Sequence, residues 1–309
     1  MRFEGFAHRA IQVPLVGALA LAALLPLIDA VGRGLGGFHV PGSAAYVQQL
    51  TLWLVFLGGL VAAREGKHLT LSTATLLGEG TVRRGTHMFA CSVAAATAGV
   101  LAYGSATLVA VNRQSGKLLP IGLPEWISEC IMPGALALIA ARYVAQASAG
   151  WGGRILALAA VGGTLALGLL PVEAVSHTWP LTLVVVAGAL LGAPVFIAMG
   201  GLALVLFFHD GTPVSAVPAE VYRLIHSPTL PAIPLLTTCG YVLAESQAST
   251  RLVRLFHALL GWMPGGIAVM VAVVCALFTT LTGGSGVTII ALGGLVYPIL
   301  RKSAYSENF

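Results

Sequence analysis

Charge is what this sequence has least of. Only 9% of its 309 residues are Asp, Glu, Lys or Arg, whereas 57% are hydrophobic. A soluble domain carries about a quarter charged residues, so this chain cannot cover an ordinary water-exposed surface. Several apolar runs reach about 20 residues, the length that crosses a bilayer as a helix. The composition therefore predicts an all-α integral membrane protein surrounded by the lipid bilayer.

Catalytic and cofactor-binding patterns are also missing. The four cysteines stand singly in apolar surroundings without CxxC spacing, which favours packing over disulfides or metal binding. No Ser/His/Asp spacing, phosphate loop or HExxH motif is present, so nothing indicates an enzyme. The eight histidines fall in expected loops, at span ends or on an amphipathic segment, which disfavours haem. We expect no organic cofactor.

The apolar runs predict about seven transmembrane helices, near residues 13–32, 44–63, 86–111, 124–146, 153–172, 180–208 and 229–245. The first is interpreted as an uncleaved anchor, because it is longer than the apolar region of a signal peptide. The sixth is interrupted by Gly192-Ala-Pro194. Two amphipathic segments, 218–226 and 249–262, are expected to lie in the membrane plane as interfacial helices.

The positive charges are distributed unequally between the two sides of the first five expected spans. Eight lie on one side and three on the other: Arg2, Arg9, Arg64, Lys67, Arg83, Arg84, Arg142 and Arg154 against Arg33, Arg113 and Lys117. The positive-inside rule then predicts a cytoplasmic N-terminus. The net charge of +5 reports orientation, so no nucleic-acid partner is expected.

An uncharged, glycine-rich break stands between two apolar runs, at 264–281 and 285–300. In lipid, such a break persists only where protein buries it or a cavity hydrates it. Freed carbonyls and nearby hydroxyls in a break of this kind hold ions in transporters. The candidate sodium- and substrate-binding residues are Thr282, Gly283, Gly284, Ser285, Gly286 and Thr288. The alternative is a simple Gly/Ser turn joining two spans.

Acidic residues are almost absent from the expected span interiors, which disfavours a proton relay and favours Na⁺ as the coupling ion. Asp29 and Glu245 fall near span ends. Glu129 lies within about a turn of the start of its span, so its carboxylate is expected to reach the membrane interface.

The chain resembles the membrane component of a TRAP transporter, tripartite and ATP-independent, with its small (DctQ-like) and large (DctM-like) permeases fused. The small-permease resemblance covers about residues 10–147 and rests on Trp53–Arg64, Gly66-Lys-His68, Gly122–Trp126, Pro133 and Arg142. The large-permease resemblance begins near residue 180 and rests on Gly192–Val195, Ala232–Leu235 with Gly240, Leu260–Gly266 and Phe278–Gly293.

This resemblance implies a Na⁺-driven importer of organic acids, such as C4-dicarboxylates or sugar acids, in the bacterial inner membrane. A periplasmic substrate-binding protein would deliver the substrate, and the large permease would work as an elevator. Three domains are expected: a small-permease block at 1–147, a linking transmembrane helix at 148–175, and the N-terminal half of the large permease at 176–309. The resemblance places Na⁺ at Thr282, Gly283 and Ser285.

Two features depart from the family pattern. Where many members have Ser-Gly-Ser at the hairpin tip, this chain has Thr282-Gly-Gly284. Family large permeases also continue beyond the position of Phe309 into a second, inverted hairpin, so we expect the remaining half on the same or a separate chain. The competing hypothesis is a non-transporting scaffold or assembly subunit whose glycines only pack helices closely.

Overall fold

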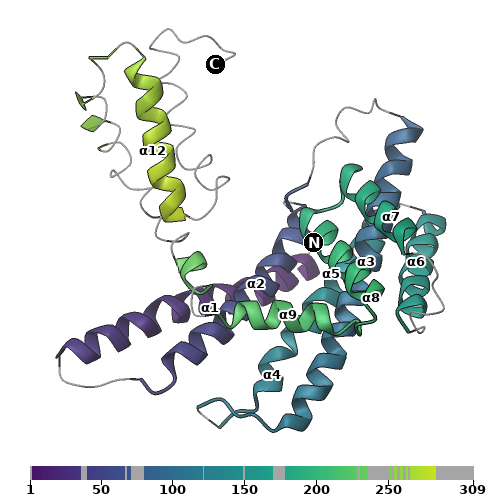
Figure 1. Cartoon of the computed structure of the whole chain (residues 1–309), viewed down its shortest axis with the longest axis horizontal. Coiled ribbons are helices and arrows are strands. Elements are labelled where there is room, and N and C mark those ends of the chain that lie inside the picture. Colours follow the sequence, from purple (N-terminus) through teal and green to yellow (C-terminus); the bar gives the residue numbers. More distant parts are fainter. Residues whose placement is uncertain are drawn as a thin grey trace. The chain divides into compact units, whose positions relative to one another are not determined.

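The computed structural model describes residues 2–35, 40–66, 68–70, 80–120, 122–148, 150–169 and 178–227, then 230–235, 265–282 and single positions between those two ranges. Its helices (Figure 1) are α1 (Arg2–Leu35), α2 (Ser43–Glu65), α3 (Thr81–Ser115), α4 (Glu125–Glu129), α5 (Ile131–Ala147), α6 (Trp151–Leu169), α7 (Trp179–Leu190), α8 (Val195–His209), α9 (Ala216–Ile225) and α12 (Gly266–Thr282). In the described part of the chain, helices and turns make up the fold, with two isolated β-bridges.

Five of the described segments are long and apolar enough to cross a membrane: Ile11–Leu35, Ser43–Glu65, Val82–Ser115, Glu125–Ala147 and Trp151–Gly168. They coincide with the first five predicted spans, and the all-α membrane fold is confirmed. The chain divides into two compact units, Met1–Ser227 and Pro228–Phe309. Helices α1 to α9 belong to the first unit, and α12 belongs to the second.

Helix α3 forms the centre of the first unit because its middle consists of small residues. Ala94, Ala95 and Ala98 are fully buried there. Small side chains let helix backbones approach closely, which is how membrane helices gain packing energy where lipid is as apolar as protein. The hydrophobic core around these alanines takes in residues of α2, α5, α6 and α8.

Helix α6 packs against α3 in the same chain direction. A Cβ atom added at Gly153 would lie 3.0 Å from the Met88 sulfur, and one added at Gly99 would lie 2.9 Å from Val161 Cγ1. Residue numbers therefore rise together along the two helices. This parallel arrangement is the one that the charge-based topology predicts for the third and fifth spans.

The predicted sixth span is wrong as a single crossing, because α7 and α8 form an antiparallel hairpin. The Thr178 hydroxyl, just before α7, lies 3.1 Å from Nδ1 of His209 at the end of α8. Val185 contacts Gly201 midway along the two arms, where an added Cβ would lie 3.0 Å from Val185 Cγ1. Arms of 12 and 15 residues rise only about 18 and 22 Å, too short for a hydrocarbon core of about 30 Å.

The turn between the two arms has a clear local cause. Gly192 adopts φ 107, a value that favours glycine, and Pro194, the N-cap residue just before α8, has no N–H to donate backwards. The tip is held by a hydrogen bond from the Val195 N–H to the Leu69 carbonyl, 2.9 Å. The predicted interruption at Gly192-Ala-Pro194 is thus confirmed, while the reversal of direction is new.

Helix α9 corresponds to the first predicted amphipathic segment. It is ten residues long, and Val217, Pro218 and Ile225 are buried along it. Its end contacts the beginning of α2, where Gln48 Nε2 donates to the His226 carbonyl over 2.8 Å. Helix α9 therefore lies at the end of the helix bundle where α2 starts.

In the second unit, α12 confirms the apolar helix predicted before the glycine-rich break. Most of the predicted seventh span at 229–245 and of the amphipathic segment at 249–262 lies outside the described residues.

Candidate functional site

The predicted hairpin tip falls at the edge of the described structure. Thr282 is the last described residue of α12, whereas Gly283, Gly284, Ser285, Gly286 and Thr288 lie outside the described residues. Two hydroxyls just before it bond within their own helix: Thr279 donates to the Cys275 carbonyl over 2.7 Å, and Thr280 donates to that of Leu277 over 2.6 Å. The sodium site therefore stays a prediction.

A polar pocket of about 320 Å³ lies at the tip of the α7–α8 hairpin. Its described lining comes from the ends of α2 and α5, the start of α3 and the hairpin turn; it includes His68, Arg83 and His87 and no carboxylate. The His68 ring lies 4.7 Å from that of Phe196, and burial lowers the pKa of His68, so this imidazole stays neutral near pH 7.

A cluster of four polar side chains joins α9 to α2 and α4. The Tyr222 hydroxyl donates to Glu125 Oε1 over 2.7 Å, and Gln49 Nε2 lies 3.3 Å from the same oxygen. His226 Nε2 lies 3.1 Å from Gln49 Nε2 and 3.9 Å from Glu125 Oε1. Burial and the neighbouring Glu125 carboxylate raise the pKa of Tyr222, so its hydroxyl keeps its proton and acts as the donor.

Glu129 lies deeper than the sequence suggested. Its side chain is 1% exposed, and Asn112 Nδ2 lies 3.0 and 2.9 Å from its two carboxylate oxygens. The expectation that Glu129 reaches the membrane interface is therefore wrong. The reason is a hydrogen-bond donor on α3, 17 residues earlier in the chain.

Asp29 is a second buried carboxylate with fixed partners. It pairs with Arg33 one helical turn later, accepts the Val40 N–H over 3.0 Å, and accepts the Ser43 hydroxyl over 3.1 Å. These contacts tie the end of α1 to the start of α2. Asp29 and Glu129, the carboxylates buried among the described residues, are thus occupied by structural hydrogen bonds.

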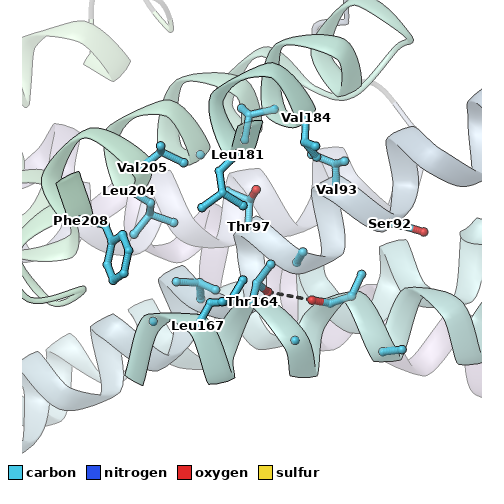
Figure 2. Close-up of a pocket in the computed structure, with 18 of the residues that line it drawn as sticks. Ser92, Val93, Thr97, Thr164, Leu167, Leu181, Val184, Leu204, Val205 and Phe208 are labelled. Atoms are coloured by element: carbon cyan, nitrogen blue, oxygen red, sulfur yellow. Dashed lines mark hydrogen bonds between the residues drawn. The ribbon is translucent and has the colours of Figure 1, made fainter. Parts of the chain in front are cut away.

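An apolar cavity of about 570 Å³ lies between α3, α6, α7 and α8 (Figure 2). Figure 2 shows Val93, Leu181, Leu204 and Phe208 pointing into it from three of these helices. Of the hydroxyls at its wall, that of Thr164 donates to the Ala160 carbonyl over 2.9 Å. No charged side chain lines it among the described residues. A charged organic acid would lose its hydration here without gaining a partner, so this cavity does not fit such a substrate.

Two family models match the chain side by side. The DctQ component of the tripartite ATP-independent periplasmic transporters matches residues 22–153, and the DctM component of the same transporters matches residues 182–309. The chain belongs to the TRAP transporter family. It is a membrane component with DctQ and DctM segments in one polypeptide, and it is a multi-pass membrane protein.

Several curated TRAP permeases are similar to part of this chain. The C4-dicarboxylate TRAP transporter large permease protein DctM of Vibrio cholerae is 28% identical over 131 residues, which is 42% of this chain and 29% of that protein. The ectoine TRAP transporter large permease protein TeaC of Halomonas elongata is 28% identical, over 39% of this chain and 29% of that protein. The isethionate TRAP transporter permease protein DctMQ of Oleidesulfovibrio alaskensis is 29% identical, over 38% and 19% respectively. The aligned part thus spans less than a third of each relative.

Within this TRAP component, α2 to α5 fall in the DctQ match, and α8, α9 and α12 fall in the DctM match. The Gln49–Glu125–Tyr222–His226 cluster therefore joins the two. The two segments that carry most of this cluster, Gly122–Trp126 and 218–226, each stand out in the sequence, but no local pattern pairs them. The available signal was a polar residue within each apolar segment: Glu125 in the first, and Tyr222 and His226 in the second. Only the three-dimensional fold shows that these side chains meet.

Proposed function

We propose that this protein is the membrane component of a Na⁺-coupled secondary transporter that imports organic acids delivered by a periplasmic substrate-binding protein. The observation that carries the proposal is the occurrence of DctQ and DctM segments in one chain. Relatives named for C4-dicarboxylates and isethionate support the organic-acid class. The location would be the bacterial inner membrane, with a cytoplasmic N-terminus.

An elevator mechanism assigns different tasks to the two compact units. The unit Met1–Ser227 contains the DctQ match and the beginning of the DctM match, packed around α3. A tightly packed body of this kind suits the stationary scaffold. The unit Pro228–Phe309 contains α12 and the predicted tip at 282–288, and would carry the moving ion and substrate site.

Sodium coupling is supported by the way in which the buried carboxylates are used. Asp29 pairs with Arg33 and Ser43, and Glu129 accepts from Asn112. A carboxylate that carries protons through a transport cycle must exchange its partners, whereas these two are held by neighbouring structural groups. Backbone carbonyl and hydroxyl oxygens at 282–288 would bind Na⁺ without the need for a side chain that gains and loses a proton.

Reconstitution of the complete transporter in liposomes with its binding protein tests the proposal. Uptake of a labelled organic acid should require both the binding protein and an inward Na⁺ gradient. Undiminished uptake under a proton gradient alone, with Na⁺ removed, would refute sodium coupling. Glu129→Gln should retain the Na⁺ dependence of the parent, because its carboxylate is assigned to the scaffold.

A scaffold subunit without transport activity is the second candidate. Its support is the cavity between α3, α6, α7 and α8, which has no charged lining among the described residues. Uptake that is equal with and without this chain, in a system that contains the other components, would favour it.

A further inference from the structure

The contact of α9 with α2 and α4 contains a histidine whose two ring nitrogens have different environments. His226 Nδ1 lies 2.9 Å from the Tyr222 carbonyl oxygen. A carbonyl only accepts, so Nδ1 carries a hydrogen. In the neutral ring, Nε2 is then an acceptor, which suits the Gln49 amide nitrogen 3.1 Å away.

A second proton on His226 changes this arrangement. Nε2 becomes a donor and faces the Gln49 amide nitrogen, which is also a donor. A half-turn of the Gln49 amide removes the conflict and brings Oε1 toward the imidazolium, at the cost of the 3.3 Å contact between Gln49 Nε2 and Glu125 Oε1. Gln49 is 6% exposed, and its Oε1 is buried with no hydrogen-bond partner in the arrangement seen. The charged ring offers this oxygen a donor.

The charged ring also gains an ionic partner. Glu125 Oε1 lies 3.9 Å from His226 Nε2, and the two side chains are 22% and 21% exposed, so protons reach the site while water screens it only partly. The Tyr222 ring packs against the His226 ring with 4.0 Å between centroids and a tilt of 39° between the ring planes, which keeps His226 beside Glu125.

Within the part of the chain that the structure describes, few other charges face His226. From α4, Glu125 faces the His226 ring, and Glu129 contributes to raising the pKa of Tyr222. From α2, the contacts are the amides of Gln48 and Gln49. Of the charged residues on α3, Arg113 lies at this end and stacks over Trp126 of α4, 5.3 Å from the ring centroid. Helix α8 has no charged residue before His209, and the Glu220–Arg223 pair of α9 is exposed.

We propose that the Gln49–Glu125–Tyr222–His226 cluster is a pH-responsive latch that holds the DctM helix α9 more firmly to the DctQ helices α2 and α4 when His226 is protonated. The latch has two states, which differ in the orientation of the Gln49 amide and in the His226–Glu125 ion pair. It links proton concentration to the cohesion of the two fused segments. It does not depend on which ion or substrate is transported.

Hydrogen–deuterium exchange of the full chain in detergent tests the latch, with rates corrected for the intrinsic effect of pH. The backbone amides of residues 216–226 should open to exchange about 2- to 5-fold less often at pH 5.5 than at pH 8, because a partly exposed ion pair stabilises by about this factor. His226→Gln keeps a polar side chain without titration and should abolish the difference. Glu125→Gln keeps an acceptor for Tyr222 but removes the ion pair with His226, and should reduce the difference.

His209→Gln is the matched control, because this histidine also ends a helix but contacts Thr178 outside the cluster. It should retain the pH response of the parent. Protection of residues 90–102 in α3 reports whether each variant is folded. The latch is refuted if the parent shows no pH response at 216–226, or if a folded His226→Gln variant retains it. If His226→Gln does not fold, Glu125→Gln decides: a pH response as large as that of the parent refutes the latch.

Discussion

At the scale of single residues, carboxylates show most clearly what the sequence could and could not predict. Hydropathy places Asp29 and Glu129 near the ends of spans, as the structure does. It does not show the burial of Glu129, because its partner Asn112 is on another helix. Hydropathy describes a residue against its chain neighbours, whereas hydrogen bonding between helices depends on how they pack.

Removing the donor to Glu129 should destabilise the protein. In Asn112→Ala, a carboxylate that is 1% exposed loses two contacts of 3.0 and 2.9 Å, at an expected cost of about 1–3 kcal/mol. Thermal unfolding in detergent measures this. Ser115→Ala is the control, since its exposed hydroxyl bonds only the Asn112 carbonyl, 2.7 Å away, in the same helix. Equal melting temperatures for the two variants would contradict the structural role of this pair.

The hydroxyls at the predicted sodium site should matter more than those one turn earlier. In the complete transporter, Thr282→Ala or Ser285→Ala should weaken the apparent Na⁺ affinity of uptake by about 5- to 150-fold. Gly283→Val should do more damage, because a β-branched residue disfavours the backbone geometry that exposes carbonyls. Thr280→Ala is the control, since its hydroxyl bonds Leu277 in its own helix. If all three variants keep the parent's Na⁺ dependence, the tip is only a turn.

At the scale of helices, the sequence predicted where elements begin and end better than how they turn. The five long spans follow from apolar length alone. The break at Gly192-Ala-Pro194 follows from glycine and proline. The reversal that makes α7 and α8 a hairpin depends on Val185 packing on Gly201 and on the bond from Val195 to Leu69. Those contacts join distant residues, so no local pattern shows them.

The hairpin should tolerate no side chain at its contact with α3. A Cβ at Gly188 would lie 2.9 Å from Cγ1 of Val93, a β-branched side chain with little freedom to move. Gly188→Ala should therefore destabilise the protein by about 1–3 kcal/mol. Gly162→Ala on α6 is the matched control, since nothing lies within 4 Å of an added Cβ, and it should be neutral or stabilise by up to about 1 kcal/mol.

Unfolding midpoints of these two alanine variants give the answer. A shift of the same sign and size in both would mean that α7 does not approach α3 as closely as the contact with Val93 requires.

At the scale of the whole molecule, the charge asymmetry and the fold make one joint prediction about sidedness. The positive-inside rule places Arg84 in the cytoplasm and Lys117 outside. Helix α6 runs parallel to α3, so its end returns the chain to the side of Lys117. The hairpin then brings His209 back beside Thr178, which keeps α9 on that same side.

Single cysteines at these positions in a cysteine-free background can be labelled with a reagent that does not cross the membrane. Cysteines at Lys117, Thr178 and His209 should react from outside intact cells, and one at Arg84 should react only after the membrane is opened. Had α7 and α8 formed one continuous crossing, Thr178 and His209 would lie on opposite sides. Opposite labelling of those two would therefore refute the hairpin, whereas outside labelling of Arg84 alone would reverse the orientation and leave the hairpin intact.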